Sequence, residues 1–370
     1  MRVAVVAEFY PRQADPTLGV WAHRQALATR DAGVEVVVLV LHRMLGRRNA
    51  ALHQPAIAEI DGLRVRYVRY VSPPRPWSYA QWGWYAAPAL RRAIRAEGAF
   101  DLVHAHNAVP AGDAVLRARL GLPLVVSVHG GDVLWTVARV PRGAATVSRT
   151  LASSRLVLAN STGTEQLARE HGARDTRVVH LGSDLPAAAV RSEAPLIATV
   201  ANLVARKRHE DVLRALAEVP EASYLVVGDG PERAALERLA QELGVARRVE
   251  FAGRLDPGEA LARSRAAWLF ALPSTEEAFG VAYIEAMAAG IPAIGCAGEP
   301  GPLEIAAAGE GLVLVPAQDP QALAVEIRRL LGDDAERGRL SRAARETVAR
   351  AFSWKQCGLA TLAAYEDAIR

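Results

Sequence analysis

The sequence predicts an α/β protein built from two doubly wound parallel sheets, one in each of two domains. A chain of 370 residues is longer than one ordinary hydrophobic core supports. Short, wholly apolar runs alternate with helical patterns, which is typical of parallel strands buried on both faces. The alternation restarts after small residues that end at position 194, so an interdomain linker is expected there. Apolar residues make up 51% of the chain and the mean hydropathy is +0.08, which indicates a folded globular protein.

The first domain is expected to span residues 1–185. Residues 3–7 predict a strand, 20–32 a helix and 34–41 a second strand, so the chain opens as a right-handed βαβ unit. Asp61-Gly62 separates two further strands and is typical of a hairpin with a primed turn. These two strands are expected at residues 57–60 and 63–71. Strands at 101–104, 123–128, 155–159 and 176–180 are expected to complete a doubly wound sheet of six or seven strands.

The second domain is expected to span residues 186–351, followed by a terminal helix at 352–370 that Ser353 could cap. Pro231 is placed at the first position of a helix. Gly228-Asp229-Gly230 is not a dinucleotide fingerprint, because the third glycine is missing. The strands of this domain are expected at residues 196–200, 224–228, 249–251, 266–272, 291–295 and 312–315. The helices are expected at residues 211–218, 281–289, 320–331 and 334–351.

The net charge of +4 is divided unevenly along the chain. Residues 1–185 hold 23 Arg and no Lys against 14 Asp plus Glu, which gives +9, whereas residues 186–370 sum to −5. A basic first half favours an anionic partner, either a phospholipid surface or a phosphorylated acceptor, ahead of nucleic acid, which is not expected to bind. The alternative is a mixed arginine-rich surface without a single patch.

An aromatic and basic segment follows three prolines of the first domain. Aromatic, amphipathic side chains next to arginines are typical of a surface that lies in a membrane interface. The alternative is that these rings pack in the core or in a groove. The segment contains Trp77, Tyr79, Trp82, Trp84 and Tyr85, followed by Arg91, Arg92 and Arg95.

Compartment signals are few. Cys296 and Cys357 cannot form a disulfide framework and have no metal-ligand spacing, so a reducing compartment is the default. Apolar residues 3–7 are too few for a signal peptide, and 36–41 too few for a membrane span. We therefore expect a cytoplasmic protein, with peripheral contact at the inner face of an anionic membrane as an option.

The stretch of residues 274–290 organises the second domain. It joins a buried strand to a helix, and ligands of open α/β sheets bind at such carboxyl-end loops. Gly280 permits close backbone approach, and the N–H groups of the helix start suit an anion. Glu277 lies in the loop and Glu285 about one turn into the helix, where their carboxylates could accept from sugar hydroxyls. The alternative is a loop glutamate and an ordinary solvated helix glutamate.

Lys207 stands out by composition, because the chain has only two lysines among 44 basic residues. A compact point charge after a strand is typical of a phosphate contact, worth about 1.5–3 kcal/mol. Two histidines, His106 and His129, mark the carboxyl ends of strands in the first domain and are either cleft residues or satisfied turn residues. The two glycines after His129 favour the cleft.

The chain resembles glycosyltransferase family 4, the retaining, nucleotide-sugar-dependent enzymes with the GT-B fold, over essentially its full length. Residues 277–285 reproduce the E-x7-E motif and continue into Ala-Met-Ala-Ala-Gly-Ile-Pro. Residues 200–208 are similar to the V-G-[RN]-L-V-x-x-K-G loop, and residues 19–25 to members that build cell-surface polysaccharides. Gly228-Asp229-Gly230-Pro231, Phe251-x-Gly253 and Pro273-Ser274 occur in the expected order.

The resemblance implies a GT-B fold whose two domains face each other across a cleft, with acceptor binding in the first domain and nucleotide-sugar binding in the second. It implies catalytic roles for Glu277, near the 3-hydroxyl and reacting carbon of the donor sugar, for His129 at the 6-hydroxyl, and for Lys207 at the diphosphate. It places Glu285 on the ribose and His106 at the acceptor. Further donor contacts are implied for Gly19, Asn202, Arg206, Gly228, Gly230, Arg254, Leu255, Phe279, Gly280 and Val281.

Three departures concern the first loop of the second domain. Asn202 stands where many members have arginine, so one phosphate contact is either missing or supplied by Arg206 or Arg208. Ala201 and Arg208 replace glycines of the family pattern. No Asp-x-Asp occurs, so no metal or other cofactor is implied.

The expected reaction is retaining transfer of a hexosyl or N-acetylhexosaminyl group from a nucleotide-diphosphate sugar to a hydroxyl acceptor in cell-surface glycan or glycolipid synthesis. A uridine donor is favoured over a guanosine donor. The alternatives are a nucleotide-sugar epimerase and a non-catalytic glycan- or lipid-binding protein of the same fold.

Overall fold

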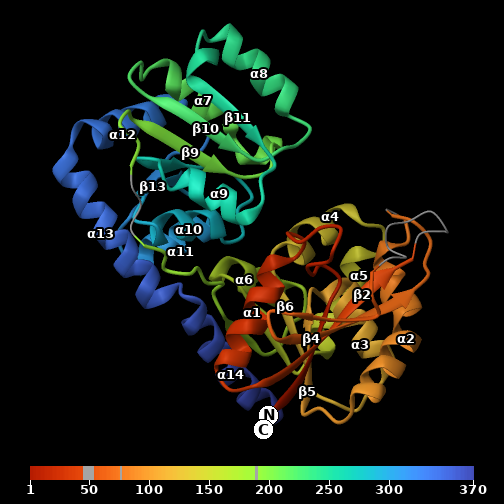
Figure 1. The fold of residues 1–370 in the computed structure, drawn as a ribbon. Helices are drawn as coiled ribbons and strands as arrows, with labels where there is room; N and C mark the ends of the chain where they lie inside the picture. Colours follow the sequence, from red (N-terminus) through yellow and green to blue (C-terminus); the bar gives the residue numbers. More distant parts are fainter. Residues whose placement is uncertain (45–53, 76, 188–190) are drawn as a thin grey trace. The chain divides into compact units, whose positions relative to one another are not determined.

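The computed structural model describes residues 1–44, 54–75, 77–187 and 191–370 (Figure 1). Contacts divide the chain into one unit of Met1–Leu181 with Trp354–Arg370 and a second unit of Gly182–Ser353. The divisions expected after residues 185 and 351 thus shift to 181 and 353. The backbone explains the shift, because the Ser183 N–H donates to the Phe352 carbonyl at 2.8 Å and Ser183 bridges Ser353. The expected linker includes residues 188–190, which lie outside the described residues.

The first unit contains an eight-stranded sheet in the order β3-β4-β2-β1-β5-β6-β7-β8. Its pairs are parallel except for the antiparallel β3–β4 hairpin at the edge. Its strands are β1 (Arg2–Ala7), β2 (Glu35–Arg43), β3 (Ile57–Ile60), β4 (Leu63–Tyr70), β5 (Leu102–His106), β6 (Leu124–Val128), β7 (Leu156–Ala159) and β8 (Thr176–Val178). The sheet is larger than the six or seven strands expected. The hairpin turn is as predicted, because Asp61 (φ 49) and Gly62 (φ 76) both have the positive φ of a primed turn.

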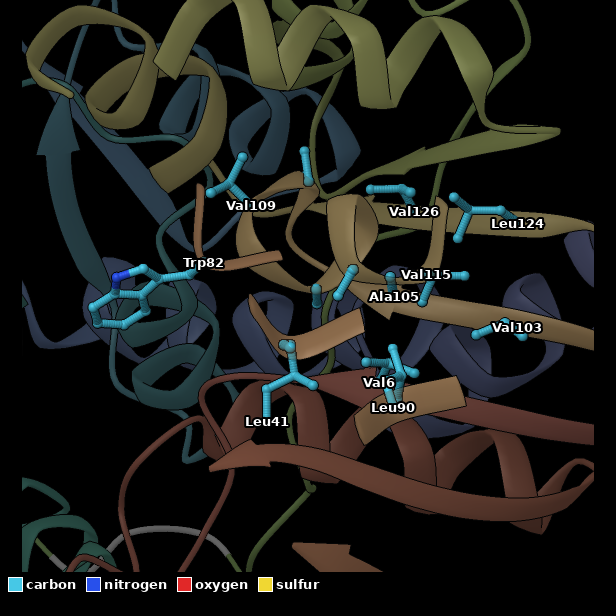
Figure 2. Packing of buried hydrophobic residues seen from close by; sticks show 14 of the residues in the cluster. Val6, Leu41, Trp82, Leu90, Val103, Ala105, Val109, Val115, Leu124 and Val126 are labelled. Carbon is cyan, nitrogen blue, oxygen red and sulfur yellow. The ribbon is translucent and has the colours of Figure 1, made fainter. Parts of the chain in front are cut away.

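Helices cover both faces of this sheet, which explains its wholly apolar strands. Alternate residues of β1 show the division, with Ala4 and Val6 in one core cluster and Val3 and Val5 in the other. Figure 2 shows the first cluster, where valines and leucines of the sheet face Leu90 and Trp82 of α2. The helices of this unit are α1 (Val20–Asp31), α2 (Trp82–Glu97), α3 (Asp113–Ala118), α4 (Val137–Arg139), α5 (Gly143–Ser153), α6 (Thr162–Glu170) and α14 (Trp354–Ile369).

The C-terminal helix α14 returns to the first unit and packs against α1. A Cβ atom added at Gly358 would lie 2.1 Å from the Ala28 carbonyl oxygen, so the two helices approach closely at this glycine. The Tyr365 hydroxyl reaches the sheet, where it contacts Nδ1 of His104 at 2.6 Å. The helix is therefore an integral part of the first core.

The second unit contains a parallel six-stranded sheet in the order β11-β10-β9-β12-β13-β14. Its strands are β9 (Leu196–Val200), β10 (Ser223–Val227), β11 (Val249–Gly253), β12 (Leu269–Ala271), β13 (Ala293–Cys296) and β14 (Leu312–Val315). Its helices are α7 (His209–Ala217), α8 (Arg233–Glu242), α9 (Pro257–Ser264), α10 (Val281–Ala288), α11 (Pro300–Ala308), α12 (Pro320–Gly332) and α13 (Asp334–Ala351). Pro231 is not at the first position of a helix as expected, because residues 231 and 232 form a turn before α8. No helix of the described residues is both long and apolar enough to span a membrane.

Candidate functional site

The strand order of the second sheet locates its ligand crevice. From β9 the chain proceeds to β10 and β11 on one side, then crosses to β12, β13 and β14 on the other. Loops that leave adjacent strands in opposite directions open a crevice at their carboxyl ends, and ligands of open α/β sheets bind there. The loop after β9 carries Lys207, and the loop after β12 carries Glu277.

These two loops meet. The Thr275 N–H donates to the Arg206 carbonyl at 2.8 Å, and the Lys207 ammonium forms an ion pair with the Glu277 carboxylate. The side chains of Lys207 and Glu277 are only 13% and 10% exposed. Since ionic side chains are seldom this buried unless they are paired, the contact accounts for the burial of both.

Further groups hold the Glu277 carboxylate and backbone in place. The Ser274 hydroxyl donates to Oε2 of Glu277 at 2.9 Å and contacts the Tyr283 hydroxyl at 3.2 Å. Burial raises the pKa of Tyr283 well above its usual value, and the nearby Glu277 adds to the shift, so the phenol stays neutral and donates to the Leu272 carbonyl. The Glu277 N–H donates to Oε2 of Glu299 at 2.9 Å.

Helix α10 begins beside this pair. Its N-cap, Gly280, has φ 96 and provides no side-chain cap, so the first helical N–H groups point out of the helix toward the loop. Phe279 is 1% exposed and its ring packs on Phe352, so only its backbone is placed to serve a ligand. Glu285 lies about one turn into α10, as expected, and it is exposed.

Gly228 and Gly230, two further residues expected to contact the donor, are each required by close packing of loops. A Cβ on Gly228 would lie 1.9 Å from the Ala201 carbonyl oxygen, and one on Gly230 2.3 Å from that of Leu203. The Gly228 N–H donates to the Gly253 carbonyl, so the segment of Arg254 and Leu255 starts beside it. These glycines permit close contact between loops, and the structure alone does not bring them to the Lys207–Glu277 pair.

Of the two arginines that could replace the missing phosphate contact at Asn202, one is already engaged. Arg208 forms hydrogen bonds to both carboxylate oxygens of Asp211, at 2.9 and 2.8 Å. Arg206 is exposed, and its guanidinium contacts no carboxylate of the described residues. Arg206 is thus the available candidate.

The first sheet has an equivalent switch point between β1 and β5. His106 ends β5 and His129 follows β6, and the two rings are parallel, with 5.3 Å between centroids and a 4° interplanar angle. Nδ1 of His106 lies 3.0 Å from Nε2 of His129. The structure therefore brings together the two histidines that the sequence had singled out, but it buries His106, which is 2% exposed.

Both rings are neutral at physiological pH. Burial lowers the pKa of His129 to about 4, and burial with neighbouring imidazoles lowers that of His106 well below its usual value. A hydrogen bond between two neutral imidazoles contains one proton, so one ring donates and the other accepts. The tautomer of His129 is thereby coupled to that of His106.

Gly19, expected to approach a phosphate, adopts φ 66 at the start of α1. A Cβ there would lie 2.2 Å from the Phe9 carbonyl carbon and oxygen, so the glycine is required by a tight fold of the β1–α1 loop.

Sequence reasoning missed a cavity of about 140 Å³ at the switch point of the first sheet. Its polar residues include Arg75, Asn107 and Asp132. Glu8 lies next to it, accepting from the Arg75 guanidinium at 2.7 Å and from the Tyr79 hydroxyl at 2.8 Å. The available signal was position, since Glu8 and Asp132 are acidic residues that closely follow buried strands.

Some rings of the aromatic segment after β4 pack in the core, and others are exposed, as a membrane-facing surface would require. Tyr79 and Trp82 are core residues, 5% and 4% exposed. Trp77 and Trp84 are 77% and 59% exposed. Trp84, Arg91, Arg92 and Arg95 lie outward on α2.

Comparison with known proteins finds glycosyltransferases along both units of the chain. Residues 18–186 match the family described as Glycosyltransferase Family 4, and residues 184–347 match Glycosyl transferases group 1. The D-inositol 3-phosphate glycosyltransferase 1 of Catenulispora acidiphila is 31% identical, covering 95% of this chain and 91% of its own. The D-inositol 3-phosphate glycosyltransferase of Mycobacterium marinum is 30% identical and covers all of this chain and 86% of its own.

Solved structures share the fold. Sucrose-phosphate synthase of Thermosynechococcus elongatus superposes with a TM-score of 0.80 at 24% identity, covering 99% of this chain and 98% of its own. HepE of Anabaena, in complex with UDP and glucose, gives a TM-score of 0.76 at 19% identity and covers 99% of both chains. The chain therefore belongs to the group 1 glycosyltransferases and is a glycosyltransferase with the GT-B fold.

Proposed function

We propose that the protein is a retaining glycosyltransferase that moves a hexosyl or N-acetylhexosaminyl group from a nucleotide-diphosphate sugar to a hydroxyl acceptor. The observation that carries the proposal is the Lys207–Glu277 ion pair at the switch point of the second sheet, next to the start of α10. A diphosphate needs a cation and N–H donors, and a sugar hydroxyl needs a carboxylate acceptor. This site offers all three.

In this proposal the donor displaces the direct contact between Lys207 and Glu277. The ammonium of Lys207 then binds the diphosphate, together with the backbone N–H groups of Phe279, Gly280 and Val281. Glu277, oriented by Ser274, accepts from hydroxyls of the donor sugar. The exposed Glu285 binds the ribose, and Arg206 supplies the phosphate contact missing at Asn202. In the remaining donor roles, Gly19, Gly228 and Gly230 admit the phosphates, and Arg254 and Leu255 lie against the base.

Transfer proceeds by substitution at the anomeric carbon. The bond from that carbon to the diphosphate oxygen breaks, and the acceptor oxygen forms its bond on the same face. The acceptor proton passes to the leaving phosphate oxygen. The protein contributes positioning and stabilisation of the charge that develops on the diphosphate, through Lys207 and the start of α10. His129 contacts the donor sugar at its 6-hydroxyl and anomeric side.

We favour a uridine donor. HepE has been solved with UDP and glucose and with UDP-glucose, and these neighbours share the fold of this chain at 19% and 17% identity.

We further propose that the acceptor belongs to cell-surface glycan or glycolipid synthesis and is met at a membrane surface. Support comes from one face of α2, where exposed Trp84 is followed at helical spacing by exposed Arg91, Arg92 and Arg95. An aromatic ring with a row of cations suits the interface of an anionic bilayer.

The test combines donor binding with product stereochemistry. The full-length chain is screened by thermal shift against UDP- and GDP-sugars, and the product with the best donor is examined by NMR. We expect a UDP-sugar to stabilise the protein and the product to keep the anomeric configuration of the donor. Inverted product would overturn the retaining assignment. If the donor is isomerised in the absence of any acceptor, the protein is an epimerase and the proposed transfer reaction is wrong.

A further inference from the structure

The cavity in the first unit indicates which class of acceptor the enzyme takes, an inference that rests on the proposed transfer reaction. The cavity is formed by segments that follow β1, β4, β5 and β6, near the switch point of the sheet. Its volume of about 140 Å³ accommodates a few waters or part of one sugar ring. A crevice at this place in an open α/β sheet is where a ligand is expected.

The walls of the cavity are aromatic. Phe9, Tyr79 and Trp135 line it, and Trp135 is 43% exposed although it is a large apolar side chain. Aromatic rings present flat apolar faces that can pack against the carbon–hydrogen face of a sugar. Their ring faces carry no positive charge to balance a phosphate.

Among the described residues, the lining of the cavity has no cation that is free to bind a phosphate. Its one cationic lining residue is Arg75, whose guanidinium already pairs with Glu8 at 2.7 Å and lies 3.9 Å from the Tyr79 ring centroid. Asp132 lines the same cavity, so a phosphate would enter beside two carboxyl groups and one neutralised cation. Burial raises the pKa of Glu8, and it raises that of Asp132 to about 7, so the site disfavours charged groups. A phosphate would lose its hydration there without gaining an unpaired cation.

Asp132 also has unused bonding capacity. It is 2% exposed, and its Oδ1 accepts from the N–H groups of Ala108 and Val109 at 3.1 and 3.5 Å. Its Oδ2 is buried and has no partner among the described residues. An unpaired buried oxygen is costly, so a hydrogen-bond donor supplied by a ligand would stabilise the site.

We propose that this cavity receives an uncharged, hydroxyl-bearing ring of the acceptor, held by aromatic packing and by a hydroxyl that donates to Asp132. Phosphorylated rings are excluded from it. The acceptor class thus differs from the phosphorylated acceptor that the basic composition of the first half favours. It differs equally from the inositol 3-phosphate in the names of relatives.

The test measures binding to the full-length chain by ligand-observed NMR, independently of turnover. The probes are two matched pairs: myo-inositol with inositol 3-phosphate, and methyl α-glucoside with its 6-phosphate. We expect at least one uncharged ring to bind about tenfold more tightly than its phosphate ester. Asp132→Asn keeps an oxygen for the two backbone N–H groups but replaces the second oxygen by an amide donor. The variant should bind the uncharged ring about tenfold more weakly than the wild type does. The ratio between the affinities for the uncharged ring and for its phosphate ester should therefore be smaller.

The control is Asp175→Asn, which removes a carboxylate from the same unit at an exposed ion pair with Arg155, outside the cavity. It should leave all four affinities unchanged. Tighter binding of the phosphate esters, no binding of any ring, or an equal effect of both variants would overturn the proposal. Donor binding by thermal shift is measured in parallel, so that failure of the acceptor inference is distinguished from failure of the transfer function.

Discussion

Lys207 and Glu277 lie 70 positions apart in the sequence and meet as an ion pair where the second sheet reverses its strand order. Each comes from a loop at the carboxyl end of one of the two central strands, β9 and β12. The pair joins these two loops, as does the bond from the Thr275 N–H to the Arg206 carbonyl. In the proposed function, the donor replaces this contact as the partner of both residues.

This relationship predicts different outcomes for stability and for catalysis. Lys207→Met leaves the Glu277 carboxylate largely buried without its cation, so the free energy of unfolding should fall by about 2 kcal/mol. The double variant Lys207→Met with Glu277→Gln should recover part of this loss, because neither charge remains. Both variants should lose transfer activity by at least about 100-fold. Urea unfolding and initial rates measure the two effects.

Two control variants test whether the effects of Lys207→Met come from the loss of this particular positive charge. Lys355, the other lysine of the chain, is exposed on α14, and Lys355→Met should change neither quantity. Lys207→Arg keeps the charge and should keep most of the stability. A Lys207→Met enzyme within a few-fold of the wild-type rate would show that the ammonium does not balance the diphosphate.

The glycines of the second unit give a separate prediction about packing. Gly228→Ala places a Cβ 1.9 Å from the Ala201 carbonyl oxygen at φ 144, so the loop between β10 and α8 must move. We expect a loss of more than about 3 kcal/mol in the free energy of unfolding. Gly244→Ala is the matched control, since it also has a positive φ of 71 but nothing within 4 Å, and should cost about 1 kcal/mol. Equal losses for both variants would contradict the steric explanation.

The sequence predicted most of the fold because its strands are short apolar runs between clear stop signals. Residues 334–351 were expected as a helix and form α13, and Asp61-Gly62 makes the expected turn. Pro231 was misplaced because a proline fixes its own φ and suits a turn as well as a first helical position. The site was predicted in part. Lys207 and Glu277 could be named from composition and motif, but their ion pair depends on which strands are neighbours, and local sequence does not record that.

The buried histidines of the first unit predict how its stability depends on pH. Burial lowers the pKa of His104 to about 3 and of His129 to about 4, and that of His106 well below its usual value. In the unfolded chain these rings take up protons below about pH 6.5, so stability falls as the pH falls from 6.5 toward 4. Asp132 acts in the opposite sense, because burial raises its pKa to about 7 and the folded state holds a proton that the unfolded state releases.

We therefore expect the urea midpoint to be lower at pH 5 than at pH 7, by a net amount equivalent to roughly 2–4 kcal/mol. Asp132→Asn removes the opposing contribution and should steepen this loss. A midpoint that is unchanged or higher at pH 5, or a shallower dependence in the variant, would contradict the assignment of neutral buried imidazoles.

The outward face of α2 predicts binding to anionic vesicles. Replacing Arg91, Arg92 and Arg95 by Gln should lower co-sedimentation with vesicles that contain phosphatidylglycerol at least about tenfold, since each cation near such a surface contributes about 1 kcal/mol. Arg328→Gln, Arg329→Gln and Arg342→Gln in the second unit remove the same charge from other helices and should have little effect. If the wild-type chain does not bind these vesicles at low salt, the proposal that the acceptor is met at a membrane surface is wrong.

The hydrogen-bonded pair of imidazoles, His106 and His129, gives the last prediction, which decides what His106 does. If His106 contacts the acceptor, its replacement should raise the acceptor KM and leave kcat nearly unchanged. Its burial and its 3.0 Å contact with His129 favour the other outcome, in which it positions His129. His106→Leu should then lower kcat about tenfold with little change in acceptor KM, because His129 loses the partner that sets its tautomer. His106→Asn can restore a hydrogen bond near the position of Nδ1 and should recover most of the rate. Recovery of kcat by Asn but not by Leu, in variants of equal stability, distinguishes positioning from mere packing.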